Sequence, residues 1–353
     1  MSHQDINFED ASMPTPPPPP PYMTPPPPPK KRKGWKIFAR ILLGGSLLLN
    51  FAMCSMMFGT RMVAEDEFPR VTERLSWGDR DAPVKVAVLR LDGVILRQAR
   101  GFLGGGQDPV TTLLREIQAV TMDPEVRGIL LKVNSPGGGV TASDEIYEAL
   151  QRFKASAPDR RIVVQVRDLA ASGGYYIALS ADAIVAQPTS MVGSVGVMLS
   201  AVNLHELGEK LGMQDVSITS SDNKALLAPL KPVTPEHEEI LQGLVDDLYV
   251  RFRDLVLENR PFDAEFADAN QLLDGRVFSG VEAHRLGLVD EVGYDAEARA
   301  LVGSLFGNEE IAFYSVSGEM GFASLLGANT ASPLSDLQAR LPGQPQFLYL
   351  WRP

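Results

Sequence analysis

Ser172 stands between a predicted strand and a predicted helix, a position from which a serine hydroxyl can act as a nucleophile. The β-branched run over 161–166 predicts a buried strand, and 173–181 predicts a helix. Gly173 and Gly174 follow the serine directly, so the main chain of a substrate could approach closely and face the first helical N–H groups. The structural alternative is that Ser172 serves only as the N-cap of that helix.

A second glycine-rich turn upstream favours the catalytic interpretation. The apolar strand predicted over 127–133 ends in Asn134-Ser-Pro-Gly-Gly-Gly139, and a helix is predicted over 141–154. Neighbouring parallel strands that end in such turns place main-chain N–H groups at one edge of a sheet, where open α/β folds bind ligands. One set of these donors could stabilise an oxyanion beside Ser172.

Histidine is the usual base for a catalytic serine, but the histidines of this chain are poorly placed for that task. His237 lies in an acidic helix start and His284 on a short helix near the end, and Ser172 lacks the G-x-S-x-G surroundings of many histidine triads. The four histidines form no H-x-x-x-H or H-E-x-x-H motif, and Cys54 is the single cysteine. We therefore expect neither a metal site nor a cofactor.

Lysine is the other known base, and Lys224 is the candidate because it lies in a small, mostly uncharged loop over 220–229. Burial lowers the pKa of an ammonium group, so a desolvated lysine can be neutral near pH 7 and accept the serine proton. Spacing alone does not choose Lys224 over Lys132 or Lys231. An ordinary surface lysine is the structural alternative.

Strands and helices alternate along the middle of the chain, which predicts an α/β fold with a mainly parallel, buried sheet. The predicted strands cover 84–91, 127–133, 161–166, 183–187, 193–199 and 216–219, and the predicted helices cover 111–120, 141–154, 173–181, 204–211 and 234–259. The 353 residues have room for one domain of about 200–250 residues plus accessory segments. We place the catalytic domain at 84–300 and a C-terminal tail, where periodicity is weak, at 301–353.

The N-terminal part has the composition of a disordered tail followed by a membrane anchor. Residues 1–33 contain proline runs that favour extended polyproline II. Residues 41–59 carry no charge and are about long enough to span a hydrocarbon core. We therefore expect a transmembrane helix within 35–59 and a linker over 60–83. A cleaved signal peptide and a buried core helix are the alternatives.

Charge on the two sides of this segment predicts its orientation and the location of the body. Cations precede the segment and acids follow it, namely Lys30, Lys31, Arg32, Lys33, Lys36 and Arg40 before it and Glu65, Asp66 and Glu67 after it. The positive-inside rule then puts the tail in the cytoplasm and the catalytic domain outside, on a single-pass protein of the inner (plasma) membrane. The net charge of −11 argues against nucleic acid as a partner, because phosphate binding needs clustered cations on the folded domain.

Over residues 84–295 several ordered motifs together resemble the signal peptide peptidase A family of serine peptidases, family S49. The motifs are Asn134-Ser-Pro-Gly-Gly-Gly139, Ala171-Ser-Gly-Gly-Tyr-Tyr176, Gly193-Ser-Val-Gly-Val197, Lys224, and Asp274-Gly-Arg-Val-Phe-Ser-Gly280 followed by Gly287-Leu-Val-Asp290. The resemblance implies the Clp protease/crotonase-like fold with repeated ββα units.

The same resemblance assigns roles to single residues. It implies Ser172 as the nucleophile, Lys224 as the base, and Gly137 or Gly138 with Gly173 as the oxyanion donors. Ser194, in the Gly-Ser-Val-Gly turn, is a candidate for orienting the lysine by a hydrogen bond, although an ordinary turn serine is the alternative.

The chain holds one catalytic unit and so resembles the short form of this family. That form assembles into a ring-like homo-oligomer in which neighbouring subunits contribute the serine and the lysine of one site. The implied substrates are released signal peptides and similar short unfolded peptides at the membrane. A crotonase-like acyl-CoA enzyme, which would have no need of Lys224, and a non-catalytic membrane scaffold of the same fold are the competing functions.

Overall fold

The chain divides into two units, residues 1–66 and 67–353, each of which is described separately. The computed structural model describes residues 33–59, 71–97, 108–307, 309–318 and 346–351. Most of the predicted proline-rich tail therefore lies outside the described residues.

In the first unit, the described residues form helix α1 (Lys33–Gly59). Large apolar side chains along it, such as Leu48 and Phe51, are exposed. Among the residues that the structure describes, no helix meets the length and apolarity needed to cross a membrane.

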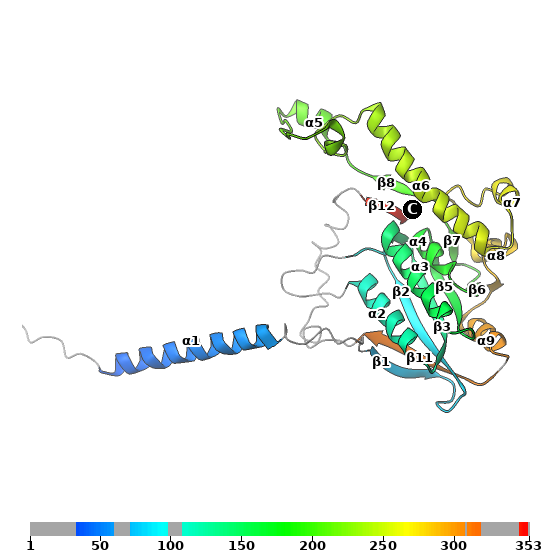
Figure 1. The fold of residues 1–353 in the computed structure, drawn as a ribbon, viewed down its shortest axis with the longest axis horizontal. Helices are drawn as coiled ribbons and strands as arrows, with labels where there is room; N and C mark the ends of the chain where they lie inside the picture. Colours follow the sequence, from blue (N-terminus) through cyan, green and yellow to red (C-terminus); the bar gives the residue numbers. More distant parts are fainter. Residues whose placement is uncertain (1–32, 60–70, 98–107, 308, 319–345, 352–353) are drawn as a thin grey trace, which may run out of the picture. The chain divides into compact units, whose positions relative to one another are not determined.

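Among the described residues of the second unit, a mixed sheet of nine strands forms the centre (Figure 1). Its main path runs β1 (Val71–Trp77), β11 (Ile311–Gly318), β2 (Val84–Asp92), β3 (Val126–Ser135), β5 (Arg161–Ala171), β6 (Ala183–Ala186) and β10 (Glu291–Val292). Strand β7 (Met191–Gly193) pairs with the end of β5 and, antiparallel, with β9 (Val277–Ser279). The pairs from β11 to β10 along the main path are parallel, and β1 alone on that path is antiparallel to its neighbour.

Helices cover both faces of this sheet, because alternate residues of its strands point to opposite sides. In β3, Leu130 packs with Val302 and Phe306 of the α9 segment (helix Asp295–Leu305), whereas Ile129 and Leu131 belong to the core on the other face. That second face is covered by α2 (Pro109–Met122), α3 (Val140–Ala155), α4 (Gly173–Ala178) and α6 (Pro235–Asn259). Because both faces of the sheet are covered, the sequences of the buried strands are continuous apolar runs.

The long helix α6 begins where the sequence predicts it, at a threonine followed by proline. Thr234 accepts a hydrogen bond from the N–H of His237 (3.2 Å), and Pro235 occupies the first helical position, where no N–H is required. The shorter elements around it are α5 (His205–Lys210), the 3-10 turn η1 (Asp222–Ala225), α7 (Ala264–Ala269) and α8 (Gly280–Arg285).

A second, three-stranded sheet lies beside α4 and α6. It consists of β4 (Gly137–Gly139), β12 (Gln346–Leu350) and β8 (Met198–Ser200), with β12 in the middle and antiparallel to both neighbours. The strand order brings the glycine turn after β3 next to a segment more than 200 residues further along the chain.

Two predicted boundaries differ from the structure. Residues 71–77, predicted as linker, form β1, and residues 311–318, predicted as tail, form β11 inside the main sheet. β1 is an edge strand with mostly exposed, polar residues and so lacks an apolar run. The predicted strand at 193–199 is two strands, β7 and β8, and 216–219 forms no strand.

Candidate active site

Ser172 lies at a tight turn between β5 and α4, in a backbone conformation that is rare for residues with a side chain. Its φ is 53° and its ψ is −116°. Two hydrogen bonds hold the turn, since Ser172 N donates to Gly193 O (2.7 Å) and Tyr176 N donates to Ser172 O (2.8 Å). Backbone strain of this kind persists only where the surrounding structure imposes it, and it is concentrated at active sites.

The hydroxyl of Ser172 does not cap helix α4, which argues against the structural alternative. Its side chain makes no capping hydrogen bond. By contrast, Ser279 accepts a hydrogen bond from Glu282 N (3.3 Å) at the start of α8. Ser172 is also only 1% exposed, so a buried hydroxyl without a capping role stands at the turn.

The two glycine turns meet at this point of the fold. Gly137 has a φ of +94°, and a Cβ atom on it would stand 2.0 Å from Tyr349 O and 2.6 Å from Gly173 N. A Cβ atom on Gly173 would stand 3.2 Å from Gly138 N. Only glycine fits such close main-chain approaches.

The N–H groups of these glycines are not equivalent. Gly137 N donates to Ser135 Oγ (3.1 Å), and that hydroxyl in turn donates to Gly93 O (2.6 Å). The N–H of Gly137 is therefore already engaged. Of the three predicted oxyanion donors, Gly138 and Gly173 are the better candidates.

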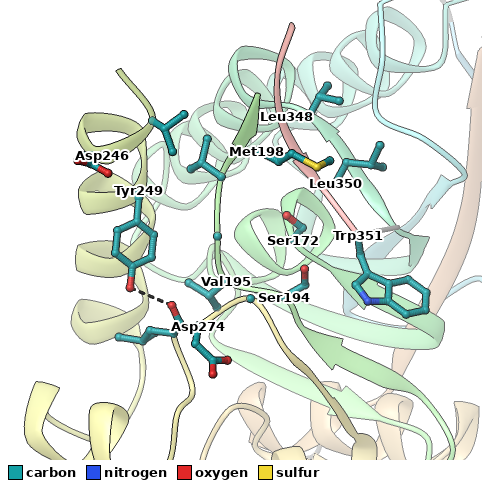
Figure 2. Close-up of a pocket in the computed structure, with 15 residues that line it drawn as sticks. Ser172, Ser194, Val195, Met198, Asp246, Tyr249, Asp274, Leu348, Leu350 and Trp351 are labelled. Atoms are coloured by element: carbon teal, nitrogen blue, oxygen red, sulfur yellow. Dashed lines mark hydrogen bonds between the residues drawn. The ribbon is translucent and has the colours of Figure 1, made fainter. Parts of the chain in front are cut away.

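A cavity of about 410 Å³ opens beside Ser172 (Figure 2). It is lined by Ser172, Ser194, Val195, Gly196, Val197, Met198, Val245, Asp246, Tyr249, Leu273, Asp274, Gly275, Leu348, Leu350 and Trp351. The lining combines the turn after β5, the loop between β7 and β8, helix α6 and strand β12. The mixture of apolar walls and a few polar groups is typical of a ligand site.

Ser194, the candidate for orienting the lysine, lines this cavity together with Ser172 (Figure 2). Its φ of 55° is again positive, and its N–H donates to Arg276 O (2.6 Å). The hydrogen bond from the Arg276 side chain lowers the pKa of Asp274, so that carboxyl stays ionised at the cavity edge. Burial raises the pKa of the Tyr249 hydroxyl, which donates to Leu273 O (2.9 Å).

Lys224 does not line the cavity and is exposed on η1. The residues around η1 are tied to the α5 segment, since Leu204 N donates to Pro229 O (2.7 Å) and Asn203 Nδ2 donates to Lys231 O (2.8 Å). Figure 1 shows α5 at the N-terminal end of α6, away from α4. Within one chain, the structure does not bring the predicted base to the predicted nucleophile.

The other bases considered from the sequence do not line the cavity either. Lys132 is ion-paired with Asp295, on the side of the sheet that α9 covers. The Nδ1 atom of His284 lies 3.4 Å from Val289 O, and His237 is in the first turn of α6. None of these three side chains contributes to the cavity wall.

Two family models match overlapping parts of this chain. Residues 154–305, which contain Ser172, Ser194 and Lys224, match the model described as Peptidase family S49. Over these residues the chain belongs to family S49. Residues 103–192 match the model described as Clp protease, and the predicted Clp protease-like α/β fold is confirmed for this S49 member.

Named relatives of this S49 chain match it over part of their length. "Putative signal peptide peptidase SppA" of Enterococcus faecium is 34% identical over 215 residues, which are 61% of each chain. "Serine protease SPPA, chloroplastic" of Arabidopsis thaliana is 31% identical over 227 residues, 64% of this chain and 32% of that protein. "Protease 4" of Haemophilus influenzae is 30% identical over 237 residues, 66% of this chain and 36% of that protein. The chain thus spans less than two thirds of each of these relatives.

Strand β12, which lies in the predicted C-terminal tail, contributes to the site although its sequence gave no such expectation. Leu348, Leu350 and Trp351 line the cavity, and Tyr349 lies against both glycine turns. The run of apolar and aromatic residues over 346–351 is a strand signal that could have been found. Its partners could not, because they lie so far away in the sequence.

Proposed function

We propose that this S49 protein is a membrane-anchored serine endopeptidase with a Ser172–Lys224 dyad. The observation that carries the proposal is the buried Ser172 hydroxyl, which caps no helix and stands on a strained turn beside two converging glycine turns. Such a turn presents a nucleophile and its oxyanion donors to the same carbonyl group.

The reaction proceeds through an ester of Ser172. The neutral amine of Lys224 takes the proton of Ser172 Oγ as that oxygen attacks the carbonyl carbon of a peptide bond. The N–H groups of Gly138 and Gly173 stabilise the oxyanion. The lysine then gives the proton to the leaving amine, and water activated by the same lysine hydrolyses the ester. No cofactor is needed.

The lysine in this proposal comes from a neighbouring subunit of a ring-like homo-oligomer. Supporting this, Lys224 is exposed and lies outside the cavity of its own chain. Large apolar side chains shortly before it in the sequence are also exposed, with Val216 at 85% and Ile218 at 98%. Exposed apolar surface marks sites of protein association, and burial there would supply the desolvation that a lysine base requires. Ser194, which lines the same cavity as Ser172, orients the incoming amine in this proposal.

The substrates are short unfolded peptides with apolar segments, such as released signal peptides. Apolar side chains of Val195, Val197 and Met198 form much of the cavity wall next to Ser172. A cavity of about 410 Å³ can take a short extended segment and is too small for a folded protein.

Covalent labelling tests the nucleophile and separates the competing functions. A fluorophosphonate should label the parent chain, and Ser172→Ala should abolish both labelling and peptide turnover. The free energy of unfolding of Ser172→Ala should change by less than about 0.5 kcal/mol, because no capping bond is lost.

Ser279→Ala is the matched control for this experiment. It removes a true helix cap and should destabilise the protein by about 1 kcal/mol while leaving the labelling intact. An acyl-CoA enzyme or a scaffold would show no Ser172-dependent turnover of peptides, and that result would overturn the proposal.

The uncharged residues 41–59 anchor the protein in the inner membrane, with residues 1–40 in the cytoplasm and the peptidase domain outside. The cations before the segment and the exposed apolar side chains of α1 support this topology. Protease added to intact spheroplasts should digest the domain and spare an epitope placed at the N-terminus. Digestion of the N-terminal epitope with a protected domain would reverse the topology.

A further inference from the structure

Strand β12 fills a slot between two strands that both belong to the candidate active site. On one side Tyr349 and Leu350 pair with Gly138 and Gly137 of β4, and on the other side Leu348 pairs with Met198 of β8. Both pairings are antiparallel. Without β12, β4 and β8 would present two strand edges to each other across an open slot next to Ser172.

The main chain of β12 runs along the proposed oxyanion donors. The carbonyl oxygen of Tyr349 stands 2.0 Å from where a Cβ atom on Gly137 would be and 3.2 Å from where one on Gly173 would be. Further along the strand, Trp351 N donates to Pro136 O (2.8 Å). A main-chain carbonyl therefore already lies between the two glycine turns, where the carbonyl of a substrate has to be placed.

The side chain of Tyr349 fills an aromatic pocket behind this carbonyl. It is fully buried, stacked on Tyr176 at 5.1 Å between ring centroids, and 4.9 Å from the ring of Phe252. Its hydroxyl donates to Leu248 O (3.0 Å). The next side chains, Leu350 and Trp351, face the cavity beside Ser172 (Figure 2).

We infer that β12 is an internal competitor, which holds the place of an extended peptide substrate. A substrate then binds as an antiparallel strand between β4 and β8 once β12 has left, and it puts an aromatic side chain into the Tyr349 pocket. Strand addition of this kind takes its affinity from main-chain hydrogen bonds and its selectivity from the pockets for alternate side chains. The inference rests on the proposed peptidase function.

A reversible crosslink between β12 and β8 tests this inference in the full-length protein. Met198→Cys with Leu348→Cys, in a Cys54→Ser background, places two thiols on directly paired residues, and antiparallel pairs have a Cα spacing that a disulfide can bridge. The oxidised protein should lose at least about tenfold of its turnover of an extended peptide with one tyrosine, and reduction should restore it. The turnover of the oxidised protein is thus compared with the turnover of the same protein after reduction.

Two further pairs complete the experiment. Leu199→Cys with Phe347→Cys joins the next paired residues of the same strands, in case the first pair fails to fold. Thr72→Cys with Ser317→Cys joins β1 to β11 at the other side of the main sheet, and its oxidation should leave turnover within twofold.

The outcomes separate this inference from the proposed function. Equal turnover in the oxidised and reduced forms of either β8–β12 pair would overturn the competitor role, as would an equal loss in the β1–β11 pair. Cleavage of the intact chain after Tyr349 would show that β12 is a substrate instead. An uncrosslinked parent protein without Ser172-dependent peptide turnover would contradict the proposed function itself.

Discussion

Coexpressed Ser172→Ala and Lys224→Ala chains should regain peptidase activity that neither variant has alone. Each variant by itself should lose several orders of magnitude, because the members of a catalytic unit act together. In mixed oligomers of the proposed kind, an intact site would combine a serine from one chain with a lysine from its neighbour. With equal amounts of both chains, roughly a quarter of the parental rate is expected.

This expectation follows from the placement of the two residues. Lys224 is exposed on η1 and does not line the cavity that contains Ser172. If the dyad formed within one chain, mixing would restore nothing, since each chain would carry one defective site. Activity of Lys224→Ala alone near the parental level would contradict the lysine base itself.

Two kinds of control variant test which residue is the base. Lys224→Arg should be as inactive as Lys224→Ala, because a guanidinium stays protonated and cannot serve as a base. His237→Ala and His284→Ala should stay within a few-fold of the parent, since neither histidine lines the cavity. Loss of activity in a histidine variant would favour the triad over the dyad.

Gly137→Ala should reduce peptide turnover at least about a hundredfold, although the residue contributes no side chain to the reaction. The new Cβ atom would collide with Tyr349 O and Gly173 N, and the φ of +94° is itself unfavourable for alanine. Relief of both strains moves the glycine turn away from Ser172. The rate constant for peptide turnover and the rate of fluorophosphonate labelling should both fall.

Gly303→Ala is the matched control, because a Cβ atom on Gly303 of α9 has no neighbour within 4 Å. It should raise the free energy of unfolding by about 0.5–1 kcal/mol and leave turnover unchanged. Parental turnover in Gly137→Ala would mean that the glycine turn does not bind the oxyanion.

The turn around Ser172 was predictable because its signals are local. A strand, a serine, two glycines and a helix follow one another within 161–181, and the structure keeps this order in β5 and α4. The same is true of the Thr234-Pro235 helix start. In each case the residues that decide the conformation are neighbours in the chain.

Strands β1, β11 and β12 were not predicted as parts of the domain because their partners are distant in sequence. β11 inserts between β1 and β2, and β12 joins β4 to β8. Such pairings are decided by packing in three dimensions, and the mostly polar β1 carries no periodic signal of its own. The distance between Lys224 and Ser172 could not be predicted for a similar reason. The spacing of two residues in a sequence does not show whether they meet within one chain or between two chains.

The exposure of Lys224 on η1 bears on the activity of a chain before it assembles with other copies. If the base comes from a neighbouring chain, as proposed, a newly made chain that has not yet assembled has a nucleophile without a base and should not cleave other unfolded proteins. Hydrolysis would then begin only when enough chains have accumulated to assemble. At low expression, specific activity per chain should rise with protein concentration, so abundance itself acts as the switch.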